Sequence, residues 1–161
     1  MILYHGSAEI VKQPRIIRAL RTLDYGQGFY TTSSLEQAQR WALRKTKDAQ
    51  RLTAYVNTYE YDEVKAKSMN IRTFVGPTEE WLEFIIANRT KGDFTHDYDI
   101  VVGPVANDKT FASFALFESG VYDAHDLIRA LKTYVLVDQY LFHTERALSA
   151  ITFKDVMEVT A

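Results

Sequence analysis

The sequence predicts one mixed α+β domain over residues 1–161. Segments with strand patterns and segments with helical patterns follow one another without a regular strand–helix–strand alternation, which argues against a parallel Rossmann-type sheet. Hydrophobic residues make up 47% and charged residues 25% of the chain, as in an ordinary globular protein. A chain of this length can bury roughly 70% of its unfolded surface, which is enough for a core without disulfides.

Seven segments show the alternation, the β-branched content or the flanking breaks of strands. They are Ile2–His5, Gly28–Thr32, Leu52–Tyr61, Asn70–Phe74, Tyr98–Val102, Tyr140–His143 and Phe153–Val159. We expect the first strand to end in a turn at Gly6-Ser7. Alternation in Leu52–Tyr61 predicts a half-buried strand, with odd-numbered residues on one face and even-numbered residues on the other.

Five further segments have helical spacing, a capping residue or both. They are Ser34–Asp48, Thr78–Thr90, a helix carrying Phe111 and Phe114 that stops at Gly120, Asp126–Thr133, and a short helix from Thr144 to Ala150. Ser33 or Ser34 is the expected cap of the first helix, and Asn107-Asp108 is the expected cap of the third.

The composition excludes several classes of site. The chain has no Cys, which rules out disulfides, thiol nucleophiles and Cys-based zinc sites. Its four histidines show no metal-ligand spacing, so we predict no metal site. The net charge of −2 provides no global basic field for nucleic acid, and the basic run from Arg40 to Arg51 is interpreted as a solvated helix face.

The sequence also predicts a cytoplasmic protein without a membrane partner. No stretch approaches the ~18 apolar residues of a membrane span. The first residues have the pattern of a core strand and not that of a signal peptide.

Two short segments carry the candidate chemistry: Tyr4-His5-Gly6-Ser7 and Gly26-Gln27-Gly28-Phe29-Tyr30-Thr31-Thr32. The second lacks the third glycine of a dinucleotide fingerprint and precedes a strand, so that fingerprint does not apply. It is followed by a capped helix in which Ala38 and Trp41 lie eight and eleven residues beyond Tyr30.

In this order, the two segments resemble the first and second motifs of ADP-ribosyltransferases of the diphtheria-toxin and poly(ADP-ribose)-polymerase type. From Leu3 to about Val159, the chain also resembles a group of small bacterial proteins long classed as a domain of unknown function. That group shares Phe29–Thr32, the Gly103–Asp108 turn and the Asp138–Thr144 segment.

The resemblance implies an ADP-ribosyltransferase-like fold, with a mostly antiparallel split β-sheet flanked by helices. It implies NAD as co-substrate and mono-ADP-ribosyltransferase activity, as the toxin of a bacterial toxin–antitoxin system. The implied partners are a protein or nucleic-acid acceptor and a cognate antitoxin; the absence of a basic surplus favours a protein acceptor slightly.

The implied site residues fit the chemistry of NAD+. Its flat, cationic nicotinamide suits an aromatic sandwich between Tyr30 and Trp41. The backbone at Gly6 can approach the carboxamide because no Cβ blocks it, and Ser7 can assist there. The resemblance places His5 at a hydroxyl of the adenosine ribose. Taken singly, His5 is more simply a structural histidine, and Tyr30 and Trp41 are core residues.

The third motif departs from the pattern, because Gln139 stands where the polymerase branch has a Glu. An amide can bind a ribose hydroxyl but carries no negative charge for an oxocarbenium-like state. Polymer formation is therefore not expected; mono-transfer, NAD+ hydrolysis or a lost activity remain. Alternation places Asp138 on the opposite face from Gln139. Asp108, with Asn107, is the candidate for the missing carboxylate, and helix capping is its alternative role.

Arg18 and Arg21 suit the pyrophosphate of NAD+, because a guanidinium has forked donors. Two functions without turnover remain as alternatives: a catalytically silent NAD or ADP-ribose-binding module, and a partner-binding domain that retains only the fold.

Overall fold

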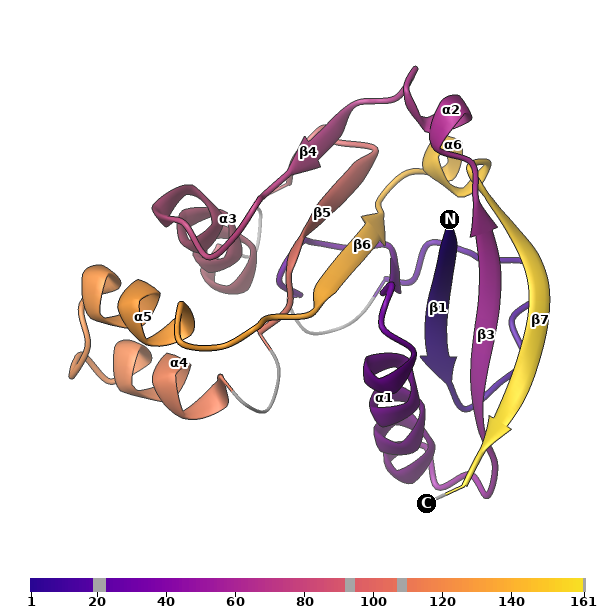
Figure 1. The fold of residues 1–161 in the computed structure, drawn as a ribbon, viewed down its shortest axis with the longest axis horizontal. Coiled ribbons are helices and arrows are strands. Elements are labelled where there is room, and N and C mark those ends of the chain that lie inside the picture. Colours follow the sequence, from indigo (N-terminus) through magenta and orange to yellow (C-terminus); the bar gives the residue numbers. More distant parts are fainter. Residues whose placement is uncertain (19–22, 92–94, 107–109, 161) are drawn as a thin grey trace.

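The structure is a computed structural model that describes residues 1–18, 23–91, 95–106 and 110–160. Two sheets carry its strands (Figure 1). The first has the order β1 (Ile2–Ser7), β3 (Ala54–Tyr61), β7 (Ile151–Val159), with antiparallel neighbours. The second has the order β2 (Phe29–Thr31), β6 (Asp138–Phe142), β5 (Ile100–Pro104), β4 (Ile71–Thr73), and its β4–β5 pair is parallel. The predicted mixed, mostly antiparallel α+β class is confirmed.

Six helices lie within the described residues: α1 (Leu35–Asp48), α2 (Glu63–Ala66), α3 (Glu79–Thr90), α4 (Phe111–Glu118), α5 (Ala124–Leu131) and α6 (Glu145–Leu148). The side chains of Ser34, Thr78 and Thr144 each cap the helix that follows them, which confirms the predicted starts of α1, α3 and α6. Helix α2 was not predicted, because it is too short to show helical periodicity. The predicted cap of α4, Asn107-Asp108, lies outside the described residues.

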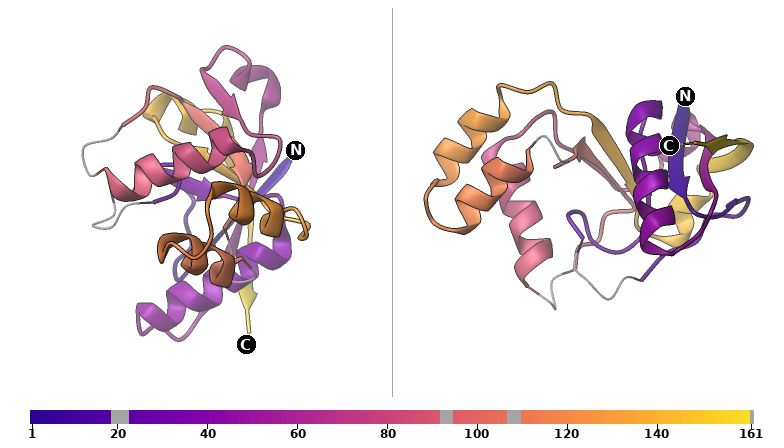
Figure 2. Two further views of the ribbon diagram at one scale, coloured as in Figure 1. Left: turned by 90° about the vertical axis from the view of Figure 1, so that its left-hand side faces the viewer. Right: turned by 90° about the horizontal axis from the view of Figure 1, so that it is seen from below.

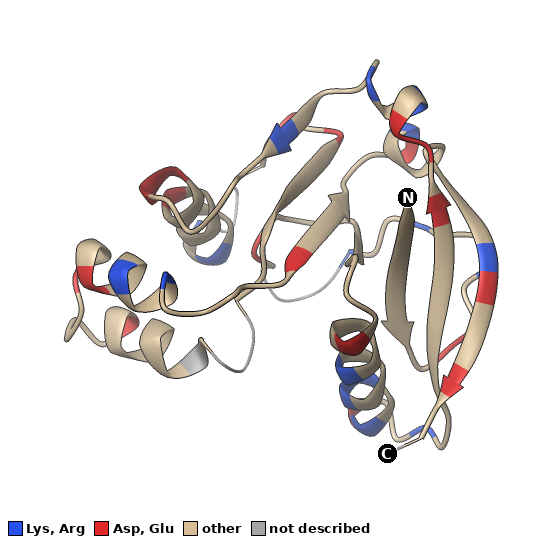
Figure 3. Ribbon diagram, in the orientation of Figure 1, with Lys and Arg blue, Asp and Glu red and all other residues tan. Residues whose placement is uncertain are grey.

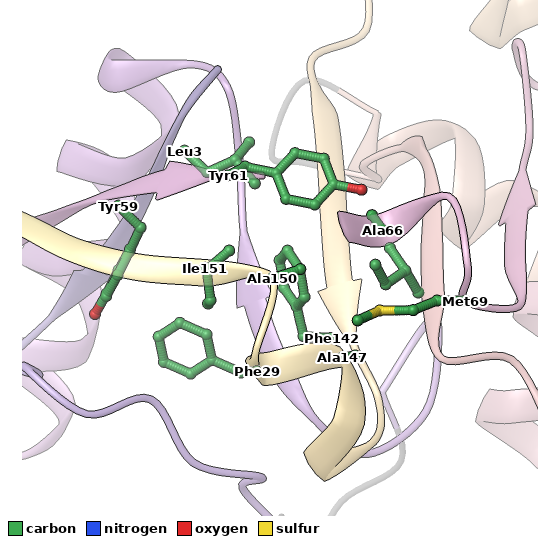
Figure 4. Close-up of a cluster of buried hydrophobic side chains, with 11 residues drawn as sticks. Leu3, Phe29, Tyr59, Tyr61, Ala66, Met69, Phe142, Ala147, Ala150 and Ile151 are labelled. Atoms are coloured by element: carbon green, nitrogen blue, oxygen red, sulfur yellow. The ribbon is translucent and has the colours of Figure 1, made fainter. Parts of the chain in front are cut away.

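The two sheets meet around a shared apolar cluster (Figure 4). Leu3 and Tyr59 enter it from the first sheet, and Phe29 and Phe142 from the second. The Phe29 and Tyr59 rings pack edge to face, with centroids 5.6 Å apart and an interplanar angle of 89°. This cluster fixes one sheet relative to the other.

Helices cover the remaining faces of the sheets (Figure 2). Helix α1 packs its buried Ala38 and Ala42 against Ala54 and Val56 of β3. A second large cluster, which includes Trp81 of α3, joins α3, α4 and α5 to the four-stranded sheet. None of the described helices has the length and apolar character needed to cross a bilayer.

Two expectations about the first sheet need correction. Strand β1 does not stop at Gly6 but continues through Ser7, and Gly6 pairs with Val56. A glycine stands there because a Cβ would lie 2.1 Å from the carbonyl oxygen of Ala38, so the residue permits close helix packing and not a turn. Strand β3 is buried on both faces, since α1 covers one face at its start and the inter-sheet cluster covers the other near its end.

Candidate functional site

The two predicted motif segments meet where β1 and β2 join. The backbones of Tyr4 and Thr32 exchange two hydrogen bonds, of 2.8 and 2.9 Å. Next to this bridge, Nδ1 of His5 lies 2.6 Å from the carbonyl oxygen of Tyr30. A carbonyl oxygen only accepts, so Nδ1 of His5 carries the proton. The structure thus brings together segments that lie 25 residues apart in the sequence.

His5 itself is a buried, neutral imidazole. Its side chain is 3% exposed and stacks on Phe29 with ring centroids 4.2 Å apart. Burial lowers its pKa well below the ordinary value, the charge of Lys45 lowers the pKa further, and the bond to Tyr30 opposes both effects. Within the described chain, the ring makes no second hydrogen bond. In this structure its environment is that of a structural histidine.

The backbone of Gly6 presents its polar groups to the open edge of β1. Backbone groups alternate in direction along a strand, so those of Gly6 point the same way as those of Tyr4, away from β3. The ammonium of Lys45 donates to the carbonyl oxygen of Gly6 at 2.8 Å. The N–H of Gly6 has no partner among the described residues, so it is the open backbone donor at this edge.

The hydroxyl of Tyr30 forms hydrogen bonds with the glycine-containing loop before β2, at residues 25–28. It donates to the carbonyl oxygen of Gly26 at 2.6 Å and accepts from the N–H of Tyr25 at 3.0 Å. Burial raises the pKa of Tyr30, so the hydroxyl stays protonated. Gly26 and Gly28 both have positive φ, of 92° and 149°, which favours glycine.

Three side chains hold this loop by its consecutive carbonyls at residues 25–27. Nε2 of His96 donates to the carbonyl oxygen of Tyr25 at 2.8 Å, and Nδ1 of His143 donates to that of Gln27 at 2.6 Å. The Tyr30 hydroxyl donates to the carbonyl oxygen of Gly26, which lies between them. The rings of His96 and His143 lie against each other, with centroids 4.1 Å apart. The loop is therefore fixed from the second sheet, an arrangement that the sequence analysis did not predict.

Other predicted site residues are half-buried or exposed, or lie outside the described residues. Trp41 is half-buried on α1, and no contact is found between its ring and the ring of Tyr30, the other wall of the predicted sandwich. Ser7 is half-buried and accepts from the N–H of Glu9. Arg18 is exposed and has no ion-pair partner among the described residues. Asp108, like Arg21, lies outside those residues.

Gln139 lies on the opposite side of the four-stranded sheet from His5. It is 3% exposed, and its Nε2 donates to the carbonyl oxygen of Pro104 at 3.4 Å. The hydroxyl of Tyr25 and the indole N–H of Trp81 reach the same carbonyl, at 2.8 and 3.3 Å. Gln139 is thus one member of a buried hydrogen-bonded group that faces the α3 side.

Asp138 is the carboxylate next to Gln139, which strand alternation predicted on the opposite face of the strand. Its carboxylate accepts from the N–H of Ser33 at 2.8 Å and from the Ser33 hydroxyl. The Thr32 hydroxyl lies 2.8 Å from the main-chain carbonyl oxygen of Asp138 and 3.2 Å from its Oδ1. Thr32 is the residue that bridges to Tyr4, so Asp138 lies beside the junction of the two motifs. The prediction that Asp138 and Gln139 point to opposite faces is confirmed. Asp138 lies on the face of the sheet that adjoins His5, whereas the ring of Tyr30 packs with Tyr25 on the Gln139 face. The sequence pattern did not indicate which face adjoins which motif residue.

The basic residues of α1 form an exposed band next to this junction (Figure 3). Arg40 pairs with Glu36 one turn earlier, and Lys45 and Lys47 lie in the last turn, where the helix dipole favours positive charge. The prediction of a solvated helix face is confirmed. Among the residues that the structure describes, no three His, Asp or Glu side chains are placed to hold a metal ion.

Comparison with known proteins gives one match. A family model described as a protein of unknown function, DUF3990, matches residues 1–153. Searches of curated proteins and of solved structures find no match. Because the family model covers nearly the whole chain, the chain belongs to the DUF3990 family.

Proposed function

We propose that this protein binds NAD+ at the junction of β1, β2 and α1, and transfers the ADP-ribose to a macromolecule in the cytoplasm. The observation that carries the proposal is the direct contact between the two motif segments, through the Tyr4–Thr32 bridge and the His5–Tyr30 hydrogen bond. Two mostly antiparallel sheets joined at this point are compatible with an ADP-ribosyltransferase-like fold.

The chemistry requires a negative charge near the reacting ribose. The bond between C1′ of the ribose and the nicotinamide nitrogen breaks, and its electron pair leaves with the now neutral nicotinamide. The ribose passes through an oxocarbenium-like state, which a nearby carboxylate stabilises. The nucleophile of the acceptor then bonds to C1′ and gives its proton to a carboxylate or to water.

Asp138 takes the carboxylate role in this proposal, in place of Gln139. The N–H and hydroxyl of Ser33 hold its carboxylate, and the Thr32 hydroxyl holds its backbone, before any substrate arrives, so little reorganisation is needed. Asp138 is also only partly buried, whereas Gln139 is enclosed with Tyr25 and Trp81.

The test is nicotinamide release and labelling of a cell lysate with NAD+ carrying a labelled ADP-ribose, for the wild type, Asp138→Asn and Gln139→Ala. Loss of the charge in Asp138→Asn is expected to reduce both signals by about 100-fold or more. Stability should change little, because Asn still accepts from Ser33 and its amide can donate to the Ser33 hydroxyl.

The exposed Asp155 on β7 gives the matched control, Asp155→Asn, which should retain full activity. A wild type that neither binds NAD+ nor releases nicotinamide in the presence of lysate would refute the proposal.

One observation favours a second candidate, a module that binds NAD+ or ADP-ribose without turnover. His5 and Gln139 are each 3% exposed, and each is engaged by the protein's own backbone. Calorimetric binding of NAD+ without nicotinamide release, in the presence of lysate, would select this candidate.

The proposed role as the toxin of a toxin–antitoxin pair rests on the resemblance of nearly the whole chain to a group of small, free-standing bacterial proteins. Expression should arrest growth, co-expression of a neighbouring gene should relieve the arrest, and Asp138→Asn should be tolerated.

A further inference from the structure

Gln37 on α1 has a largely buried side chain whose amide has no partner among the residues that the structure describes. The residue is 4% exposed, yet its amide makes no hydrogen bond to any described residue. In the described part of the chain, no fully buried side-chain nitrogen or oxygen lacks a partner. The amide atoms of Gln37, which have no partner among the described residues, therefore keep a small contact with solvent.

This amide lies on the side of α1 that adjoins the open edge of β1. Residues four apart are neighbours on a helix surface, so Gln37 precedes Trp41, and Trp41 precedes Lys45, along one side. Lys45 reaches the carbonyl oxygen of Gly6, and Ala38, next to Gln37, packs directly against Gly6. Helical spacing therefore places Gln37 and the half-buried Trp41 on the side of α1 from which Lys45 reaches Gly6.

A carboxamide needs a donor for its oxygen and an acceptor for its NH₂ group. The N–H of Gly6 supplies the donor. The carbonyl oxygen of Gly6 already accepts from Lys45 at 2.8 Å and keeps one lone pair, whereas the amide oxygen of Gln37 accepts from no described residue. The Oε1 atom of Gln37 is unengaged and buried, where a hydrogen bond discriminates most strongly between ligands.

We infer that Gln37 is a specificity-determining residue that accepts a hydrogen bond from the carboxamide NH₂ of the nicotinamide ring, with the ring against Trp41. This inference rests on the proposed NAD+ binding and adds a residue that neither motif contains. The amide is largely shielded from solvent, so a hydrogen bond from a bound carboxamide would form at a poorly hydrated position.

The test compares two ligands by calorimetry: NAD+ and its analogue with a methyl ketone in place of the carboxamide. The analogue retains the acceptor oxygen and lacks the NH₂ group. The wild type should bind NAD+ about tenfold more tightly than the analogue. Gln37→Leu should bind NAD+ about tenfold more weakly than the wild type and should bind the two ligands equally. Gln39→Leu, on the same helix, is the control and should retain the wild-type preference.

Thermal unfolding separates a ligand-binding role from a structural one. Replacing an unpartnered buried amide with an apolar side chain of similar size should leave the Tm of Gln37→Leu equal to or above that of the wild type. A wild type that binds both ligands equally, or a Gln37→Leu variant that retains the preference for NAD+, would overturn the inference and leave the proposed function standing. Failure of the wild type to bind NAD+ at millimolar concentration would overturn both.

Discussion

Buried histidines link the stability of this protein to pH. Desolvation lowers the pKa of His5 and of His96; Lys45 lowers that of His5 further, and His143 that of His96. Each ring is therefore harder to protonate in the folded chain than in the unfolded chain. The unfolded state binds more protons as the pH falls below the ordinary histidine pKa of about 6.5, so folding stability declines in that range.

We expect the free energy of unfolding in urea to fall between pH 7.5 and pH 5.5, and His96→Gln to weaken that dependence. The variant loses bonds to Tyr25 and Tyr98 and is less stable at both pH values, but its slope with pH is smaller. His125→Gln, at a side chain 81% exposed, is the control. An unchanged slope in His96→Gln would contradict the assignment.

Gly6 is the position at which one added methyl group should cost most. In Gly6→Ala the new Cβ would lie 2.1 Å from the carbonyl oxygen of Ala38 and 2.6 Å from the nitrogen of Ala42, so α1 would have to move. We expect a loss of about 3 kcal/mol or more in urea unfolding. Gly76→Ala places its Cβ in open space and should change stability by less than about 1 kcal/mol. Equal effects of the two changes would show that the helix yields easily.

At the scale of elements, the glycine-containing loop before β2 depends on one hydroxyl. Tyr30→Phe retains the ring but removes the donor to Gly26 and the acceptor for the N–H of Tyr25. We expect a destabilisation of about 1–3 kcal/mol and faster hydrogen exchange at the Tyr25 amide. NAD+ affinity should persist if the ring is the contributing surface. Unchanged exchange at Tyr25 would mean that the histidines alone hold the loop.

Helix α1 shows what a sequence can predict. Its start at Ser34 and its end at Asp48 follow from a capping side chain and regular apolar spacing, both local properties. That Gly6 is the contact point of this helix is a property of two segments that are distant in sequence. In a sequence, a glycine in a turn cannot be told from a glycine in a tight packing contact, so β1 was predicted to end too early.

Strand β6 shows where the prediction of the site stops. Alternation correctly separates Asp138 from Gln139, because side-chain direction is local. Which face adjoins β1 depends on the pairing of β6 with β2 and on the Tyr4–Thr32 bridge, both of which join residues more than 25 positions apart. Gln37 was missed for the same reason: a helical glutamine carries no signal that its amide will be enclosed.

At the scale of the whole molecule, charge bears on the choice of acceptor. The net charge is −2, and exposed basic residues lie on α1, where Arg40 is paired with Glu36, and also in the segment from Lys12 to Arg18. A polyanion would gain little long-range attraction. We therefore expect the labelled product to be lost on protease digestion and to survive nuclease digestion. Labelling that is sensitive to nuclease and declines steeply with salt would indicate a nucleic-acid acceptor.

The contacts of the glycine-containing loop also set an order of events during folding. The bond from His96 spans 71 residues and the bond from His143 spans 116 residues, so both are contacts of long range in the sequence. Contacts of such long range close after local helices have formed. This loop should therefore gain protection last in pulse-labelled hydrogen exchange. A chain that has collapsed but not finished folding would lack the loop that holds the Tyr30 hydroxyl, so the proposed NAD+ site would be complete only in fully folded molecules.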